Sequence, residues 1–205
     1  FNGEINFLRQ NNQCNNTARV ADVVYHEYGH GFHAYSIVQG AGSFDGASSE
    51  GLSDYMAATI TGDPATARGF YRNSTQPLRD IAPDHVWPDH VGEIHFTGII
   101  IAGALWDLRT ELVAAMGEEE GIAHADHLFW NVARLSTDIP DAYADVLLAD
   151  DDNGDLSDGT PNKCMIDETF GRHGLGPGAD ESGLFAISHE PPEFVAADAS
   201  IVLPM

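Results

Sequence analysis

Lysine is almost missing from this chain of 205 residues, in which nine basic residues stand against 32 acidic ones and only Lys163 is a lysine. The formal net charge of −23 repels polyanions, so we exclude nucleic acids and anionic membrane surfaces as partners. Long apolar runs are missing too. The longest candidates, such as residues 99–105, suit a buried helix and are too short for a membrane span. The composition favours solubility and the binding of cations.

Cysteine is also scarce, with only Cys14 and Cys164. The pair could form one disulfide between distant parts of the chain, which would fit an oxidising compartment, or could remain two unrelated thiols. We recognise no signal-peptide pattern at the start of the sequence. The chain opens on Phe1-Asn2-Gly3, from which we expect a mature or trimmed product.

The patterns of apolar residues predict a mainly helical fold with little strand. A hydrophobic content of 43% in a chain of this length suits one globular domain. Residues 4–8 alternate like a strand, and Thr17 is the expected N-cap of the first helix. Helices are predicted over residues 18–36, 48–61, 95–116, 121–135, 141–148 and 163–173, with an irregular segment over 70–92. We place the domain at residues 1–178 and an acidic, Gly- and Pro-containing tail at residues 179–205.

The most informative motif is HEYGH at residues 26–30, in the middle of the first predicted helix. A spacing of four places His26 and His30 on one face of a helix, where both imidazoles can bind a single Zn²⁺. Glu27 follows the first histidine, so its carboxylate can accept a proton from an attacking water. The motif predicts the centre of a zinc hydrolase.

A third zinc ligand is expected on the next helix. Glu50 lies twenty residues after His30, enough for the chain to leave the first helix, turn and return. Asp54 follows one helical turn later and can accept the outer N–H of a ligating imidazole, which fixes its tautomer. The alternative is an exposed glutamate at a helix start and a surface aspartate.

These residues resemble the thermolysin-like gluzincin metallopeptidases, and most closely their fungalysin-type branch. HEYGHG followed by EGLSDYMA is similar to that branch's helix pair, with nineteen residues between the second histidine and the glutamate. The last predicted helix, CMIDETFGRHGLG at residues 164–176, resembles the end of the catalytic domain. The resemblance reaches to about Gly178. It implies an α+β zincin fold: a helical catalytic lobe with a short N-terminal edge strand and with the N-terminal sheet lobe largely absent.

The same resemblance implies two further roles. GEIHFTGII at residues 92–100 is similar to the segment that bears the transition-state histidine, which places that role on His95. Residues 78–80 resemble the stretch whose arginine binds a substrate carbonyl, which places that role on Arg79. A histidine that caps a helix start is the alternative for His95, and an ion pair with Asp80 or Asp84 is the alternative for Arg79.

One position departs from the pattern of the family. Thermolysin has a tyrosine nine residues before the third ligand, where this chain has Ala41. Either Tyr35 or another group takes its role, or the role is vacant. Because the sheet lobe is largely absent, a propeptide or lobe missing from this chain is a further candidate partner.

An acidic turn at residues 149–159 has the carboxylate density of a calcium loop. Its candidate calcium ligands are Asp151, Asn153, Asp155 and Asp158. The EF-hand pattern fails, because its sixth position is a leucine and its twelfth an asparagine. A calcium site of another type and a solvated turn both remain open.

The other histidines have no defensible ligand spacing. His33 is out of register with the zinc pair, so we expect it to pack or to face solvent. His124 and His127, the latter next to Asp126, could weakly bind metal. The remaining ones without a predicted role are His85, His90, His173 and His189.

The sequence thus predicts a secreted zinc-dependent endopeptidase that acts on peptides or proteins. Two alternatives remain: a gluzincin-type aminopeptidase and a non-catalytic zinc-binding module that keeps the fold. An aminopeptidase of that group would need a motif for the substrate amine, which this chain lacks, and a non-catalytic module would have no need of Glu27.

Overall fold

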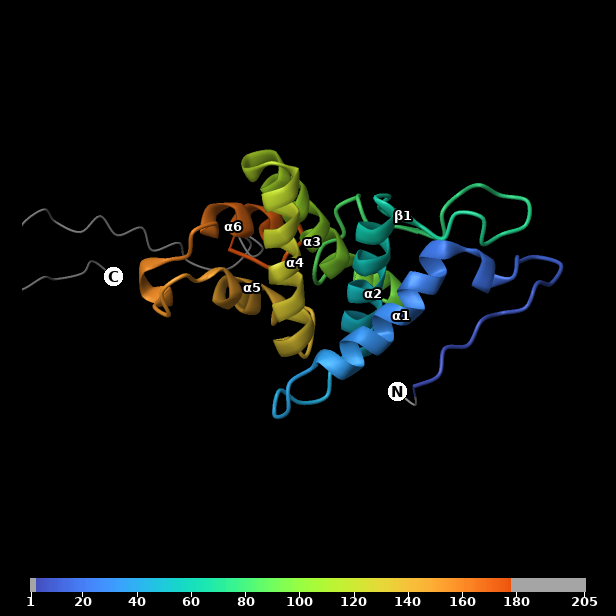
Figure 1. Ribbon diagram of the computed structural model, residues 1–205, viewed down its shortest axis with the longest axis horizontal. Helices are drawn as coiled ribbons and strands as arrows, with labels where there is room; N and C mark the ends of the chain where they lie inside the picture. The colour runs from blue at the N-terminus through green and yellow to red at the C-terminus, as the bar shows by residue number, and fades with distance from the viewer. Residues whose placement is uncertain (1–2, 178–205) are drawn as a thin grey trace, which may run out of the picture.

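Six α-helices carry most of residues 3–177, the part of the chain that the computed structural model describes (Figure 1). In chain order they are α1 Ala21–Ser36, α2 Gly46–Thr61, α3 Ile94–Met116, α4 Glu118–Leu135, α5 Ala142–Asp150 and α6 Lys163–Arg172. Two short 3-10 helices, Thr17–Arg19 and Leu156–Asp158, complete the helical part of this range. The mainly helical prediction is therefore confirmed. The tail predicted over residues 179–205 lies outside the described residues.

Helix α3 forms the centre of the core. Its side chains are apolar on almost every face, and it packs against α2, α4 and α6. Ile100, Ile101 and Leu112 have no exposed surface. Even so, no helix in the described range is long and apolar enough to cross a membrane.

Glycines let α2 lie very close to both of its neighbours. A Cβ added to Gly29 of α1 would come within 2.8 Å of the Cα of Ser53, and one added to Gly51 would collide with the carbonyl oxygen of Gly98 in α3. Figure 1 shows α1 crossing α2, and the two helices are in contact. The close approach brings the residues of α1 and α2 that carry the predicted chemistry within reach of one another.

Replacing Gly51 with alanine is expected to lower the free energy of unfolding by about 2–3 kcal/mol, because the new methyl group overpacks the contact between α2 and α3. Chemical denaturation of both proteins measures the difference. Gly46→Ala is the matched control in the same helix, since its Cβ would meet only Ile94 at 4.0 Å. A Gly51→Ala protein as stable as the Gly46→Ala protein would contradict this account of the packing.

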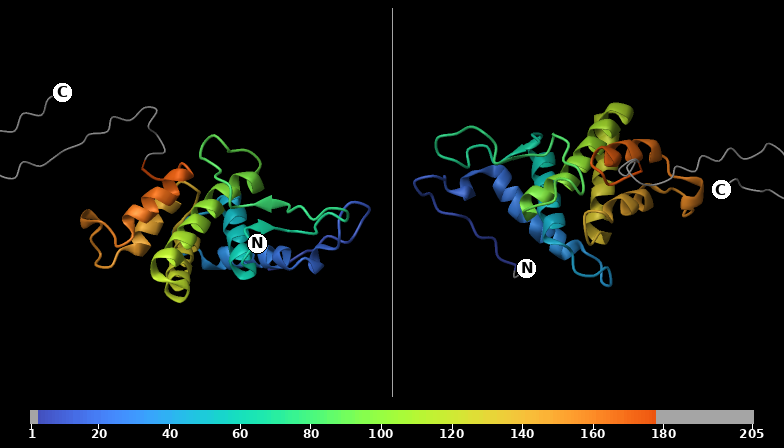
Figure 2. Two further views of the ribbon diagram at one scale, coloured as in Figure 1. Left: turned by 90° about the horizontal axis from the view of Figure 1, so that it is seen from above. Right: turned by 180° about the vertical axis from the view of Figure 1, so that it is seen from behind.

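A short antiparallel strand pair lies within the region where no strand was predicted. Strands β1 (Ala65–Thr66) and β2 (Arg79–Asp80) pair Ala65 with Asp80 and Thr66 with Arg79. The left view of Figure 2 shows the pair and its connecting loop at the same end of the molecule as the N-terminal segment. The pairing fixes the position of Arg79 beside α2.

The predicted N-terminal edge strand at residues 4–8 is wrong. A strand needs a neighbour for its backbone groups, and within the described range residues 4–8 take part in no β-bridge; the isolated bridge near them joins Cys14 to Tyr71. Leu8 instead exchanges hydrogen bonds with Thr17, donating to its Oγ1 at 2.8 Å and accepting from its N–H at 3.1 Å. The N-cap role predicted for Thr17 is also wrong, because Asn16 caps a separate 3-10 turn and α1 begins later, at Ala21.

The cysteines do not form the disulfide that was considered. Cys14 lies in the bridge to Tyr71, whereas Cys164 is exposed on α6, and both are free thiols. The sequence argument for an oxidising compartment is thereby lost.

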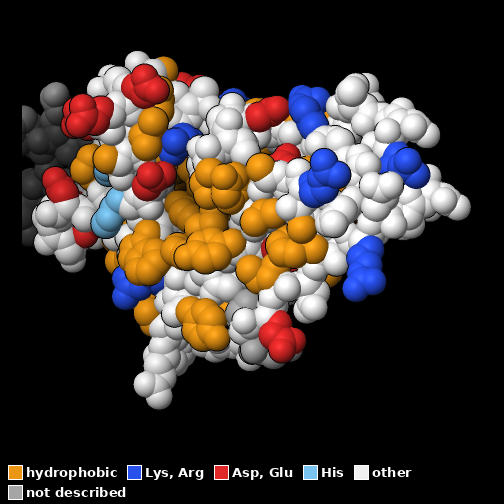
Figure 3. Space-filling view, turned by 45° about the vertical axis from the view of Figure 1, so that its right-hand side comes forward, with side chains coloured by type: hydrophobic (Ala, Val, Ile, Leu, Met, Phe, Trp, Pro, Cys, Tyr) orange, Lys and Arg blue, Asp and Glu red, His pale blue; other side chains and the backbone are white. Residues whose placement is uncertain are grey.

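One face of the molecule gathers apolar side chains over its middle, with charged side chains around them (Figure 3). The large apolar residues with substantial exposure include Tyr28, Tyr35 and Trp130. With Phe32 these three line an open hollow beside α1 and α4. The hollow is separate from the pocket described below.

Candidate metal centre

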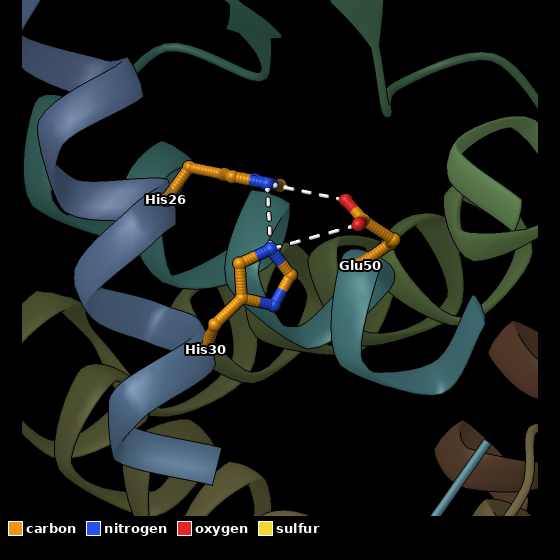
Figure 4. A group of neighbouring side chains, drawn as sticks. All are labelled: His26, His30 and Glu50. Atoms are coloured by element: carbon orange, nitrogen blue, oxygen red, sulfur yellow. Dashed lines mark hydrogen bonds and ion pairs between the residues drawn. The ribbon is translucent and has the colours of Figure 1, made fainter. Parts of the chain in front are cut away.

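The three predicted zinc ligands meet between α1 and α2. The Nε2 atoms of His26 and His30 are 3.1 Å apart, and the carboxylate of Glu50 lies 3.2 Å from the first and 3.6 Å from the second. Figure 4 shows the three side chains pointing toward one another from the two helices. A tetrahedral zinc ion with ligand bonds of about 2.0–2.2 Å would space its ligands about 3.3–3.5 Å apart, close to these distances.

Hydrogen bonds fix which nitrogen of each histidine faces the centre. The Nδ1–H of His26 donates to Asp54 at 2.7 Å, and Nδ1 of His30 lies 2.9 Å from the hydroxyl of Ser49 and 3.2 Å from that of Ser53. With Nδ1 engaged on both rings, both Nε2 atoms are left to bind a cation. Oε2 of Glu50 is buried there, 3.2 Å from Nε2 of His26 and 3.4 Å from Nε2 of His95.

The electrostatics of this centre favour a positive charge between the three side chains. Burial opposes protonation of His26, but its hydrogen bonds with Asp54 and Glu50 outweigh burial and raise its pKa to about 9. Burial also acts against ionisation of Glu50, yet the hydrogen bond with His26 holds its pKa below the usual value. Burial and the charge of His26 lower the pKa of His30. The pocket between the three side chains can thus be filled by a proton on His26 or by a metal ion that displaces it.

Arg79 does not make either of the ion pairs considered from the sequence. Its guanidinium binds both carboxylate oxygens of Asp54, with Nε 2.5 Å from Oδ2 and Nη2 2.8 Å from Oδ1. Asp54 is fully buried, and although burial opposes its ionisation, His26 and Arg79 together hold its pKa below the usual value. The predicted contact between Asp54 and His26 is therefore present, and Arg79 adds a second partner to the same carboxylate.

His95 approaches the metal ligands from the start of α3. Its Nε2 lies 3.4 Å from Oε2 of Glu50, and its Nδ1 lies 2.6 Å from the carboxylate of Glu93. The same carboxylate accepts the backbone N–H of His95 and so caps α3. Because a carboxylate only accepts, Nδ1 carries a proton and Nε2 is the nitrogen directed at the centre.

Glu27 lines a pocket beside the metal ligands. The pocket has a volume of about 210 Å³ and is also lined by His26, Asp54, Arg79 and His95. The neighbouring pocket shares Leu78, Arg79 and His95 with it, so the two meet at these residues. A bound peptide could pass from one to the other across the face of the proposed centre.

Some partners in this site were missed from the sequence. Ser49 and Ser53 were predicted to lie in the second helix, without a role in the site. They lie one residue before and three residues after Glu50, on the turn that faces α1. Glu93 was not assigned either, although an acid two residues before a helix-start histidine is placed to meet its ring. Tyr35, the candidate replacement for the family tyrosine, is 78% exposed and lines the separate hollow near Trp130.

Within the described part of the chain, His33 is a buried histidine without a hydrogen-bond partner. It has no exposed surface, both ring nitrogens lack hydrogen bonds, and its ring packs against Phe44 at 4.1 Å. The expectation that it packs is confirmed. Burial, aided by the charge of His30, lowers its pKa to about 4.

This burial predicts a pH-dependent stability. The folded-state pKa of about 4 lies below the ordinary value of 6.5, so the unfolded chain binds the proton more tightly. The stabilisation is complete above pH 6.5 and is lost as the pH falls to 4, by about 3 kcal/mol in total. Denaturation of wild type and His33→Leu across this range measures the effect, because the variant should lack this part of the pH dependence. Parallel curves for the two proteins would contradict it.

The acidic turn does not gather its carboxylates. Among the described residues, the groups of at least three potential ligands within 4.8 Å of one another do not include Asp151, Asp155 or Asp158. Asn153 donates to Asp158 at 3.0 Å, and Asp155 accepts from Ser157. These contacts give the calcium prediction no geometric support. His124, a weak metal candidate, pairs with Asp150 at 2.8 Å.

Comparison with known proteins adds no identification, since neither a family model nor a curated protein matches the chain.

Proposed function

We propose that this chain is a zinc-dependent endopeptidase with the helical lobe of a zincin, in which His26, His30 and Glu50 bind the metal. The observation that carries the proposal is the convergence of two imidazole Nε2 atoms and one carboxylate at 3.1–3.6 Å. The burial of Oε2 of Glu50 supports it, because a carboxylate oxygen removed from water needs a positive charge beside it, which a metal ion between Glu50, His26 and His30 would supply.

Each nearby side chain has a distinct part in peptide hydrolysis. When bound, zinc supplies a Lewis acid that lowers the pKa of water toward neutrality and polarises the scissile carbonyl. Glu27 takes a proton from the attacking water and delivers it to the nitrogen of the leaving amine as the C–N bond breaks. His95, as an imidazolium whose Nδ1–H is held by Glu93, donates from Nε2 to the oxyanion that develops on the carbonyl oxygen.

Asp54 and Arg79 act by positioning. Asp54 holds the ring of His26 in the tautomer that leaves Nε2 free, and Arg79 keeps Asp54 ionised and in place. The substrate contact that the resemblance implies for Arg79 is compatible with this pairing only through the guanidinium atoms that Asp54 leaves free. With the cysteines unpaired, the proposed secreted location depends on the resemblance alone.

Hydrolysis of a doubly blocked peptide tests the proposal. An internally quenched peptide with an acetylated amino terminus and an amidated carboxyl terminus can be cut only by an endopeptidase. We expect cleavage by the zinc-loaded chain, loss of cleavage after chelation and recovery when zinc is added back. Cleavage restricted to peptides with a free amino terminus would indicate the aminopeptidase alternative. Zinc binding without cleavage of any peptide would indicate the non-catalytic module.

A further inference from the structure

A second group of potential metal ligands lies outside the proposed active site. Asp84 comes from the loop between β2 and α3, Asp107 from α3, and His173 from the residue after α6. Nε2 of His173 is 3.5 Å from Oδ2 of Asp107 and 3.9 Å from Oδ1 of Asp84. One atom of each side chain lies within 4.8 Å of the other two.

The buried histidine of this group directs one ring nitrogen at two carboxylates. His173 has no exposed surface, and its Nδ1 lies 2.9 Å from the carbonyl oxygen of His85. A carbonyl only accepts, so Nδ1 carries a proton and Nε2 is the nitrogen that faces the two carboxylates. Within the described part of the chain that Nε2 has no hydrogen-bond partner, and Oδ2 of Asp107 has only its ion pair with Arg172.

The packing around His173 holds this orientation. A Cβ on Gly103 would lie only 2.5 Å from Cε1 of the imidazole, so the absence of a side chain there gives the ring its place against α3. The backbone carbonyl of His173 accepts from the N–H of Trp87 at 2.9 Å, which ties the same residue to the loop a second time. The ring cannot turn away from the carboxylates without losing its hydrogen bond to the carbonyl oxygen of His85.

The neighbouring charges leave the group negative. Arg172 lies 3.1 Å from Oδ2 of Asp107, but its other nitrogen is 3.7 Å from Glu111, so its charge is shared. Around His173 there are then three carboxylates, of Asp84, Asp107 and Glu111, and one guanidinium. A divalent cation would bring this group close to neutrality.

We propose that Asp84, Asp107 and His173 bind a second zinc ion that fastens the loop before α3 to α3 and to the end of α6. An imidazole with two carboxylates suits zinc, whereas calcium and magnesium prefer oxygen ligands alone. Ligands of a tetrahedral zinc ion lie about 3.3–3.5 Å apart, so the longer separation, to the exposed Asp84, has to shorten. The side chain of Asp84 is 53% exposed and is free to turn inward.

The role of this ion is structural. The loop that it fastens leads from Arg79 in β2 to His95 at the start of α3, and both of these residues face the proposed active site. The ion would stabilise the folded chain without touching a substrate. This inference does not depend on peptidase activity.

Zinc stoichiometry of the full chain tests the inference. After chelation and reloading in a zinc buffer, we expect two zinc ions per wild-type chain by elemental analysis and one per Asp84→Asn chain. Asp89→Asn is the matched control, because it makes the same charge change at an exposed position of the same loop and should keep both ions. Zinc should also raise the Tm of a His26→Ala chain by about 5 °C or more, and Asp84→Asn in that background should remove the shift.

The outcomes separate the two zinc sites. One ion in wild type that His26→Ala removes, or two ions that persist in Asp84→Asn, would overturn the second site. One ion that Asp84→Asn removes and His26→Ala retains would support the second site and refute the proposed active centre. A buried imidazolium that binds no metal would appear as a Tm of the His26→Ala chain that does not respond to zinc, which also overturns the inference.

Discussion

Replacing Glu27 with glutamine is expected to lower kcat/KM for peptide hydrolysis by about 10²–10⁴-fold, with the zinc content unchanged. Glutamine has nearly the shape of glutamate but cannot accept a proton from the attacking water. The metal ligands stay in place, because Glu27 lines the pocket and is not one of the three converging side chains.

Steady-state cleavage of the doubly blocked peptide, together with elemental analysis of zinc, measures both parts of this prediction. Glu119→Gln provides the control, since it makes the same change at an exposed position in the first turn of α4. The proposed mechanism would fail if the Glu27→Gln protein cleaved as fast as the control.

Asp54→Ala is expected to be the most destabilising single change near the centre, at about 3–5 kcal/mol, because it leaves the Arg79 guanidinium unpaired beside a buried histidine. The side chain of Asp54 is 1% exposed and that of Arg79 is 15% exposed. The same change frees the Nδ1–H of His26 and should weaken zinc binding by about 10–100-fold.

A double-mutant cycle isolates the contact. Denaturation of Asp54→Ala, Arg79→Ala and the double variant should show that the double variant loses less stability than the sum of the two single changes. Asp54→Asn separates the two roles, because an amide oxygen can still accept from His26 while the charge that balances Arg79 is gone. We expect zinc affinity near that of wild type but reduced stability. Strictly additive losses in the cycle would show that the two side chains do not act together.

The helices could be predicted well because their signals are local. The apolar residues of α3 recur on nearly all faces, and the predicted range 95–116 differs from the observed helix by one residue. At the end of α2, Gly62 adopts a left-handed conformation with φ of 71°, as the glycine before Asp63 and Pro64 indicated. Such signals do not depend on what the helix packs against.

The metal ligands were predictable for the same reason. His26 and His30 lie one turn apart in α1, and Glu50 follows in the next helix, so helix geometry and one short connection bring them together. Strands of two residues are too short to show a recognisable sequence pattern. Arg79 pairs with Asp54 and not with Asp80 or Asp84 because of how β2 lies beside α2, which the sequence does not indicate. The predicted edge strand failed because alternation of side chains cannot supply a neighbour for the backbone.

The ligand group around His173 could not be predicted from the sequence. Nothing near it in the sequence indicates a ligand group, because its carboxylate neighbours come from two other segments. Only the packing of α6 against α3 brings them together.

The two ligand groups differ in how much of the chain they enclose. The first lies wholly within α1 and α2, so an ion bound there closes a short loop and can attach as soon as this helix pair has formed. The second joins residue 84 to residue 173 and closes a loop of nearly half the chain. The entropy that a cross-link removes from the unfolded chain grows with the length of the loop it closes. An ion at the second group would therefore bind late in folding, and it would stabilise the chain once its helices have assembled.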